Sequence, residues 1–309
     1  MTRTSRTTRP VLAALAALSL GLTLSACASD DTDAPSSAGT TPGKNVSIGI
    51  HSGWDEGIAV SHLVKVMLED DGYTVTTETA DPGVVYTGLA GGGYDLNFDM
   101  WLPVTHGDYL KQYGDNLEQL GVWYDDARLT IAVNEDAPIT SLDELAGAAD
   151  AFDGRLVGIE AGAGLTRITQ DEAIPAYGLE KMEFIISSTP AMLAELKSRT
   201  TDGENVVVTL WRPHWAYDEF PIRDLEDPKG VMGEAEEIHT VGRKGFAADQ
   251  PEVAALVKAL ELTDEQLTSL ENIMFNDDAG KDPDASVRTW LEANPTFVDD
   301  LKTKAGLAS

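Results

Sequence analysis

Three tryptophans lie where the chain could build a binding site for an organic cation. Trp54, Trp101 and Trp211 each come after an apolar run, at a predicted strand end. An indole offers an electron-rich face, which suits a quaternary ammonium because that group has no N–H for an acceptor to hold. Each desolvated cation–π contact contributes about 2 kcal/mol, so three such contacts supply ~6 kcal/mol of binding free energy. Micromolar affinity needs roughly 8 kcal/mol. We therefore expect a second anchoring point.

Two segments could supply that anchor by holding a carboxylate. Residues 99–106, with the sequence DMWLPVTH, end in His106, whose ring can donate a hydrogen bond. Pro103 fixes its own φ and stiffens the segment before it. The glycine loop at 161–164 precedes a predicted helix, and the first backbone N–H groups of a helix can bind an anion. From the residues alone, a plain tight turn is the alternative for this loop.

The other aromatic and histidine residues are harder to assign. Trp215 comes one helical turn after Trp211 and suits a structural role as well as a functional one. Trp123 and Trp290 are predicted to pack in the core. The five histidines are scattered, and without an HExxH motif or a cysteine partner they do not predict a metal site; they are His51, His62, His106, His214 and His239.

Cofactor and catalytic motifs are absent from the sequence. The third glycine of a dinucleotide fingerprint would fall at Arg167, and no Gly-Lys-Ser/Thr run occurs. There is also no GxSxG element for a serine nucleophile. We expect no cofactor, no metal and no enzymatic activity.

The elements that must position these residues alternate along the chain. Predicted strands at 45–50, 73–79, 96–98, 129–133, 156–160, 184–187 and 206–210 are interspersed with predicted helices, among them 82–91, 191–199, 251–262, 263–275 and 285–294. A capping box at 141–144 opens a further helix. Alternating strands and helices predict an α/β fold, whose ligands bind beyond the carboxyl ends of the strands. That rule places Trp54 and Trp101 in one cleft.

Two such α/β series with an extended connection predict two lobes around a cleft. We assign residues 45–135 plus 242–309 to lobe I and 136–241 to lobe II. The run at 237–246 carries the chain back to the first lobe, so the hinge is crossed twice. This arrangement allows the lobes to close on a ligand.

The start of the chain has the features of an export signal. Residues 1–26 combine three arginines with an apolar run at 11–24 that is too short to span a bilayer. The sequence LSAC, ending at Cys27, resembles a bacterial lipobox, which predicts a lipid anchor on that residue; an ordinary signal peptide with an incidental cysteine is the alternative. Residues 27–44 then form a flexible tether, and the protein is expected on the outer face of the cell membrane.

The charge of the chain argues against two classes of partner. Its net charge is −30, and removing residues 1–26 would make it −33. Such a surface repels nucleic acid and anionic lipid, so neither is expected as a binding partner.

Taken together, the motifs resemble those of substrate-binding lipoproteins of ABC importers for glycine betaine and proline betaine. The segments that carry the resemblance are GWDE (53–56), DMWLPVTH (99–106), STPAM (188–192), WRPHW (211–215) and EEIHTVGRKGF (236–246). The resemblance implies the two-lobed periplasmic-binding-protein fold of type II. It also implies a monomeric receptor for an osmoprotectant importer, with a permease and a cytoplasmic ATPase as partners.

The resemblance also implies roles for individual residues. A prism of Trp54, Trp101 and Trp211 surrounds the trimethylammonium group. The carboxylate is held by His106 and by the backbone N–H groups of Gly164 and Leu165. His214 and Trp215 are further candidates because they lie in a matching motif.

Other ligands and functions stay open from the sequence. Related choline binders carry an acid two residues after the first tryptophan, the place of Glu56, which keeps choline and carnitine open. His106 favours a ligand with a carboxylate. An exported enzyme acting on betaine-like compounds and a sensory lipoprotein without a transporter are the remaining alternatives.

Overall fold

The structure is a computed structural model that describes residues 43–277 and 281–307. The predicted signal peptide (1–26), Cys27 and all but the last two residues of the predicted tether (27–44) lie outside the described residues. No helix in the described part is both long enough and apolar enough to cross a membrane.

The first half of the chain builds one side of a mixed sheet around parallel strands. Strand β1 (Asn45–His51) pairs in parallel with β2 (Thr74–Ala80) and β3 (Leu96–Leu102). The returning strand β9 (Glu236–Arg243) runs antiparallel to β3 and to the first part of β4 (Leu117–Asn134). The order on this side is β2-β1-β3-β9-β4.

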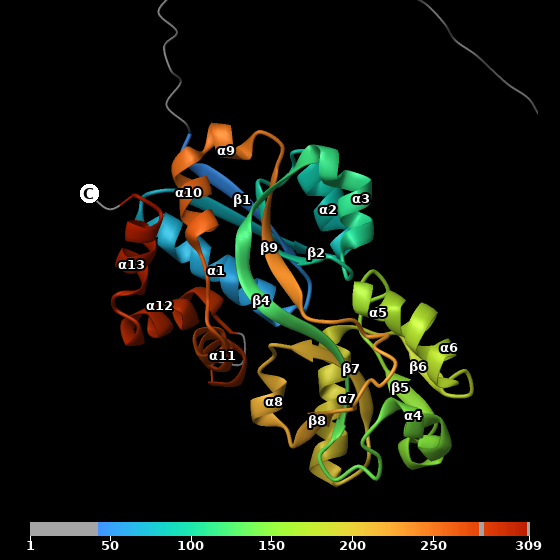
Figure 1. Ribbon diagram of the computed structural model, residues 1–309. Coiled ribbons are helices and arrows are strands. Elements are labelled where there is room, and N and C mark those ends of the chain that lie inside the picture. The colour runs from blue at the N-terminus through green and yellow to red at the C-terminus, as the bar shows by residue number, and fades with distance from the viewer. Residues whose placement is uncertain (1–42, 278–280, 308–309) are drawn as a thin grey trace, which may run out of the picture. The chain divides into compact units, whose positions relative to one another are not determined.

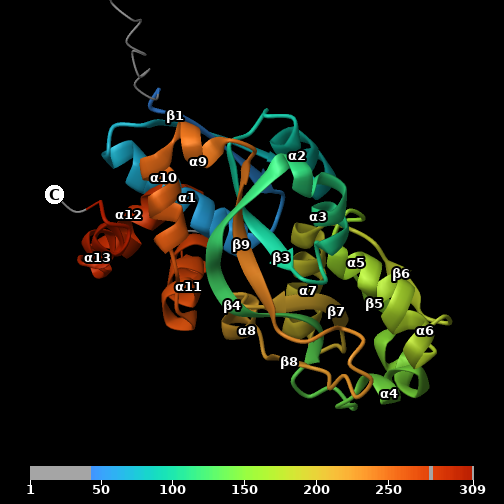
Figure 2. The ribbon, with the colours of Figure 1, turned by 45° about the horizontal axis from the view of Figure 1, so that its top comes forward.

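The long strand β4 continues into the other side of the sheet. Its residues Arg128 to Val133 pair antiparallel with β7 (Val207–Arg212), and its last three residues pair with β8 (Ile222–Asp224). Beyond β7 lie the parallel strands β5 (Arg155–Val157) and β6 (Glu183–Ile185). In Figures 1 and 2, β4 runs from the upper group of strands into the lower one.

The pairing of β4 and β9 bears on where two lobes would divide. β4 changes partner from β9 to β7 between Ala127 and Arg128, and all of β9 pairs with β3 and β4. These changes fall several residues before the expected boundaries at 135/136 and 241/242. The residue boundaries of the two lobes stay a prediction.

Helix α1 (Asp55–Asp70) shows how sequence pattern becomes packing. Ala59, Leu63 and Met67, together with their neighbours, are buried against the sheet and against α11 (Asp264–Glu271) and α12 (Pro283–Ala293). The chain leaves the helix through Gly72, whose φ of +81° suits glycine. The apolar face therefore fixes α1, and with it the acidic residues of its first turn, beside β1 and β3.

The remaining helices are mostly short. They are α2 (Pro82–Ala90), α3 (Gly107–Tyr113), α4 (Leu142–Leu145), α5 (Gly164–Ile168), α6 (Ile174–Tyr177), α7 (Thr189–Asp202), α8 (Ala216–Glu219), α9 (Phe246–Asp249), α10 (Pro251–Ala259) and α13 (Phe297–Lys304). 3₁₀ segments occupy Gly114–Asn116 and Ala146–Phe152, and π-helical segments occupy Thr169–Ala173 and Asn272–Asp277. The predicted capping box is present, with Ser141 and Glu144 in their expected roles.

The predicted α/β class is confirmed, and so are most of the predicted elements. The predicted strands at 45–50, 73–79 and 206–210 differ from β1, β2 and β7 by one or two residues at an end. β3 and β4 are longer than predicted. Neither β8 and β9 nor α3, α8, α9 and α13 were predicted as elements. Trp123 and Trp290 are each 1% exposed, so their predicted place in the core is also confirmed.

Candidate functional site

A small cavity brings together seven of the sequence-predicted ligand residues, from four parts of the chain. About 270 Å³ of space lies between its lining atoms, part of it open to solvent. We call it the cage cavity. Its lining residues are Trp54, Glu56, Trp101, Thr105, His106, Leu129, Ile159, Ala163, Gly164, Leu165 and Trp211.

Sheet topology explains why distant tryptophans meet at this cavity. β1 and β3 are parallel neighbours, so the chain leaves both at the same edge of the sheet, where Trp54 and Trp101 lie. Trp211 stands near the end of β7, paired with Leu129 of β4. The three rings are 3–5% exposed, so each is almost wholly enclosed by protein.

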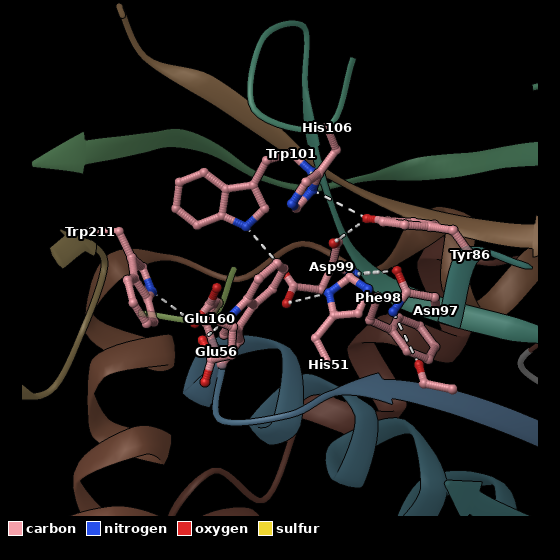
Figure 3. A network of polar contacts seen from close by, with 12 residues as sticks. His51, Glu56, Tyr86, Asn97, Phe98, Asp99, Trp101, His106, Glu160 and Trp211 are labelled. Atoms are coloured by element: carbon pink, nitrogen blue, oxygen red, sulfur yellow. Dashed lines mark hydrogen bonds and ion pairs between the residues drawn. The ribbon is translucent and has the colours of Figure 1, made fainter. Parts of the chain in front are cut away.

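Each of the three indoles is held at its nitrogen by a carboxyl group. The Nε1–H of Trp101 donates to Asp99 Oδ1 at 2.8 Å, and that of Trp211 donates to Glu56 Oε2 at 2.9 Å (Figure 3). The Nε1–H of Trp54 makes a longer bond of 3.4 Å to Glu160 Oε2. A hydrogen bond at the ring edge fixes the orientation of the ring without covering its faces. The ring of Trp54 also stacks with that of His106, with centroids 5.3 Å apart.

His106 presents a neutral ring with one free donor. Its Nδ1 accepts the backbone N–H of Trp101 at 2.9 Å and lies 3.2 Å from the hydroxyl of Tyr86 (Figure 3). An acceptor Nδ1 requires the hydrogen on Nε2, which has no partner among the described residues. Burial, with His51 and Arg167 adding to it, lowers the pKa of His106 well below its usual range. His106 therefore lines the cavity as an uncharged N–H donor.

The glycine loop reaches the cavity because position 164 has no side chain. A Cβ on Gly164 would overlap the carbonyl oxygen of Thr105, so only glycine allows this close approach. Gly164 and Leu165 begin a helical stretch that runs through α5 and a π-helical segment into α6, ending at Tyr177. As first-turn residues their N–H groups have no carbonyl within the helix to bind. They are therefore free to bind an anion.

Two carboxyl groups, those of Asp55 and Glu56, stand in the first turn of α1 beside the cavity. Glu56 is 1% exposed and Asp55 7%. Burial raises the pKa of Glu56 well above its usual range, and Asp99 and Glu271 raise it further, while its own backbone N–H and the Trp211 indole lower it. Burial raises the pKa of Asp55 to about 7, against the opposing hydrogen bond from Trp215. Burial therefore raises the pKa of both carboxyl groups in this turn.

Of the nine predicted residues, seven line the cage cavity, and His214 and Trp215 do not. His214 packs edge-on against Trp211, with ring centroids 4.7 Å apart, and its Nδ1 accepts the N–H of Ala216. The Nε1–H of Trp215 donates to Asp55 Oδ2 at 2.5 Å. Both residues thus support the rings and acids behind the cavity. That any of the nine contacts a ligand stays a prediction.

Sequence reasoning missed four lining residues and two supporting acids. Leu129, Ile159 and Ala163 look like ordinary apolar core residues in the sequence, and nothing in it distinguishes them. Thr105 lies within the DMWLPVTH segment and could have been included. Asp99 and Glu160 could have been suspected because a buried indole N–H needs an acceptor.

Comparison with known families identifies the chain. Residues 44–293 match the family model described as the substrate-binding domain of ABC-type glycine betaine transport systems, OpuAC. The chain belongs to this family. The members of this family are extracytoplasmic substrate-binding proteins that serve transport.

Individual relatives agree with this membership. A glycine betaine/carnitine transport binding protein of Listeria monocytogenes is 37% identical over 145 residues; the match covers 46% of this chain and 47% of that protein, so the chain spans about half the length of this relative. The lactococcal OpuAC structure, closed and complexed with glycine betaine, has a TM-score of 0.76 at 26% identity and covers 83% of this chain and 98% of that one.

A structural neighbour with another ligand is equally similar in fold. An ABC-transporter choline-binding protein in complex with choline has a TM-score of 0.77 at 25% identity, covering 86% of this chain and 93% of the neighbour. With these neighbours, the predicted two-lobed type II periplasmic-binding-protein fold is confirmed.

Proposed function

We propose that this protein captures glycine betaine or proline betaine outside the cytoplasm and delivers it to an ABC-type osmoprotectant importer. The observation that carries the proposal is the cage cavity, where three indoles and an uncharged imidazole donor from separate elements meet. A betaine has both a quaternary ammonium and a carboxylate, so it matches both kinds of group. Membership of the glycine betaine family supports this ligand class.

The cationic end of the ligand is assigned to Trp54, Trp101 and Trp211. Their ring nitrogens are occupied by Glu160, Asp99 and Glu56, so only π faces are left to meet a ligand. A methylated ammonium cannot donate to an acceptor but is attracted to such faces when water is excluded. The nearly complete burial of the rings provides that exclusion.

The carboxylate end is assigned to His106 and the first turn of α5. The Nε2–H of His106 and the backbone N–H groups of Gly164 and Leu165 line the same cavity. All three are uncharged donors, so together they bind an anion without placing a second full positive charge near the ligand's ammonium.

A choline or carnitine receptor is the second candidate, and two observations favour it. Glu56 lines the cavity, where its carboxyl could face a cation that carries no carboxylate of its own. The choline-binding neighbour has nearly the same backbone. Choline, however, could offer the His106 donor only a neutral hydroxyl in place of a carboxylate, and a neutral hydrogen bond contributes less than one to a charged group. Carnitine carries a carboxylate and does not meet this objection.

The remaining parts of the proposal concern place and partners. We propose a lipid anchor at Cys27, a monomeric receptor, and an ABC permease with its cytoplasmic ATPase as the acceptor of the ligand. A lipobox-like LSAC segment at 24–27 supports the anchor. No catalytic role, resident cofactor or metal is part of the proposal; turnover assays with betaine, choline and carnitine would test the enzyme alternative.

Calorimetric titration with glycine betaine, proline betaine, carnitine and choline tests the proposal. Trp54→Ala, Trp101→Ala and Trp211→Ala should each weaken betaine binding about thirtyfold, since one desolvated cation–π contact contributes about 2 kcal/mol. Tyr73→Ala removes a half-buried aromatic ring that does not line the cavity, and it should leave the affinity unchanged. Wild-type affinity in all three tryptophan variants would refute the cage.

A further inference from the structure

Four buried carboxyl groups stand together behind the cage cavity. Asp55, Glu56, Asp99 and Glu271 are between 0 and 7% exposed. Gly57 lets α1 approach β3 closely, since a Cβ there would come within 2.5 Å of Asp99 Oδ2. Carboxylates that are this close and this buried cannot all be ionised without cationic partners.

No lysine or arginine pairs with any of these four acids in the described part of the chain. In the described part of the chain, the ion pairs of these four acids are with histidines alone: His51 with Asp99 at 3.3 Å and His214 with Asp55 at 3.8 Å. Burial lowers the pKa of His214 to about 3, so that ring is neutral. Titratable groups face Glu56 and its acidic neighbours from several elements. They are Asp55 on α1, Asp99 on β3, Glu271 on α11, Glu160 after β5, Asp218 on α8, Tyr86 on α2, Tyr124 on β4, and the rings of His51, His106 and His214.

These neighbours determine which form Glu56 takes in the empty cavity. Burial, Asp99 and Glu271 all raise its pKa, and the Trp211 indole opposes them only in part. Burial and Asp55 likewise raise the pKa of Glu271 well above its usual range. Glu56 is the member of the group that lines the cage cavity, so it is the one that a bound cation would face directly.

We propose that capture of a quaternary ammonium in the cage cavity releases a proton from Glu56 to solvent. The O–H bond of the Glu56 carboxyl breaks, its electron pair stays on the oxygen, and the proton leaves for water. The ligand's fixed positive charge then takes the place of that proton as the partner of the carboxylate. This inference rests on the proposed function, because it requires a cation in the cage.

The sign of the resulting pH dependence follows from linkage. The free protein holds the proton up to a raised pKa, and the bound cation lowers that pKa. Affinity therefore rises with pH between the pKa of Glu56 in the bound protein and its pKa in the free protein, and it is constant above the latter. For one proton the rise is at most about tenfold per pH unit. Neutral His106 contributes nothing to this dependence.

Calorimetry with glycine betaine in buffers of different ionisation enthalpy counts the protons released. For the wild-type protein over a series of pH values, the binding enthalpy should vary with the buffer, giving up to one proton released, and affinity should rise with pH until the pKa of Glu56 in the free protein is passed. Glu56→Gln should bind more weakly, release no proton and show no pH dependence. Glu144→Gln changes an exposed carboxylate in a capping box that glutamine can still complete, and it should behave as wild type.

Glu271→Gln provides a second test that leaves the cavity wall intact. Glutamine removes a neighbour that raises the pKa of Glu56, so the pH window should move to lower values while proton release persists. Betaine binding without proton release in wild type, or release from Glu56→Gln equal to that of wild type, would overturn the inference and leave the proposed function standing. Absence of betaine binding at every pH would overturn both.

Discussion

Replacing His106 tests the carboxylate end of the site with an internal control. The Nε2–H of His106 is its one uncommitted polar group, and a hydrogen bond to a charged group contributes about 1.5–3 kcal/mol. We therefore expect His106→Ala to weaken glycine betaine binding by about tenfold to 150-fold. The same change also removes the acceptor for the Trp101 backbone N–H, which affects any ligand of the cage.

Choline separates these two effects because it has a quaternary ammonium and no carboxylate. Its hydroxyl can accept at most a neutral hydrogen bond, so its loss of affinity measures mainly the disturbance of Trp101, and the ratio of the betaine loss to the choline loss reports what the carboxylate adds. His106→Gln keeps a side-chain donor and should recover part of the betaine affinity. Titration calorimetry of both ligands against the wild-type protein and the two variants measures these ratios.

The pH dependence of that ratio distinguishes a neutral ring from a charged one. Burial lowers the pKa of His106, so the ring is already neutral at pH 6, and the ratio should be the same at pH 6 and pH 8. An imidazolium anchor would give a ratio that falls as pH rises through its pKa. Equal losses for betaine and choline, or a ratio that falls in this way, would refute the assignment.

Two further substitutions test the surroundings of the cage. Burial raises the pKa of Asp55 to about 7 in the folded protein, so between about pH 4 and pH 7 the native state holds a proton that the unfolded state has lost. The free energy of unfolding is therefore highest at low pH and falls by ~4 kcal/mol as pH rises through this range. Asp55→Asn keeps an acceptor for Trp215 and should flatten this profile in urea unfolding at pH 5 and pH 8; a wild-type slope in the variant would assign the effect elsewhere. Gly164→Ala would force its Cβ onto the Thr105 carbonyl oxygen and should weaken betaine binding at least tenfold in titration calorimetry. Gly162→Ala is the control: the nearest atom to its added Cβ is 3.7 Å away, so this variant should bind as wild type. Equal affinity of the two alanine variants would contradict the close approach at position 164.

The sequence predicted the cavity because its key residues occupy strand ends in recognisable motifs. Trp54 and Trp101 follow strands that are parallel neighbours, and parallel strands deliver their following loops to one edge. That argument needs only local pattern and a general rule of topology. The same rule did not reach Trp211, whose strand belongs to the other half of the sheet; its place at a predicted strand end and the resemblance of its motif grouped it with the other two.

The acids behind the rings could not be placed from sequence because their contacts are long-range. Trp211 and Glu56 are 155 residues apart, and Trp54 and Glu160 are 106 apart. No local spacing encodes such a pairing. The first part of β4 was missed for a related reason: residues 117–127 lack alternation and are held by pairing with β9, with register shifts along the way.

A ligand that keeps the shape of glycine betaine and loses its positive charge tests the central claim most directly. In 3,3-dimethylbutanoate a carbon atom replaces the quaternary nitrogen, so the methyl groups and the carboxylate are kept. If the indoles of Trp54, Trp101 and Trp211 hold a cation through their π faces, this compound should compete with glycine betaine at least about a hundredfold more weakly in a displacement titration. Binding within threefold of glycine betaine would contradict the account.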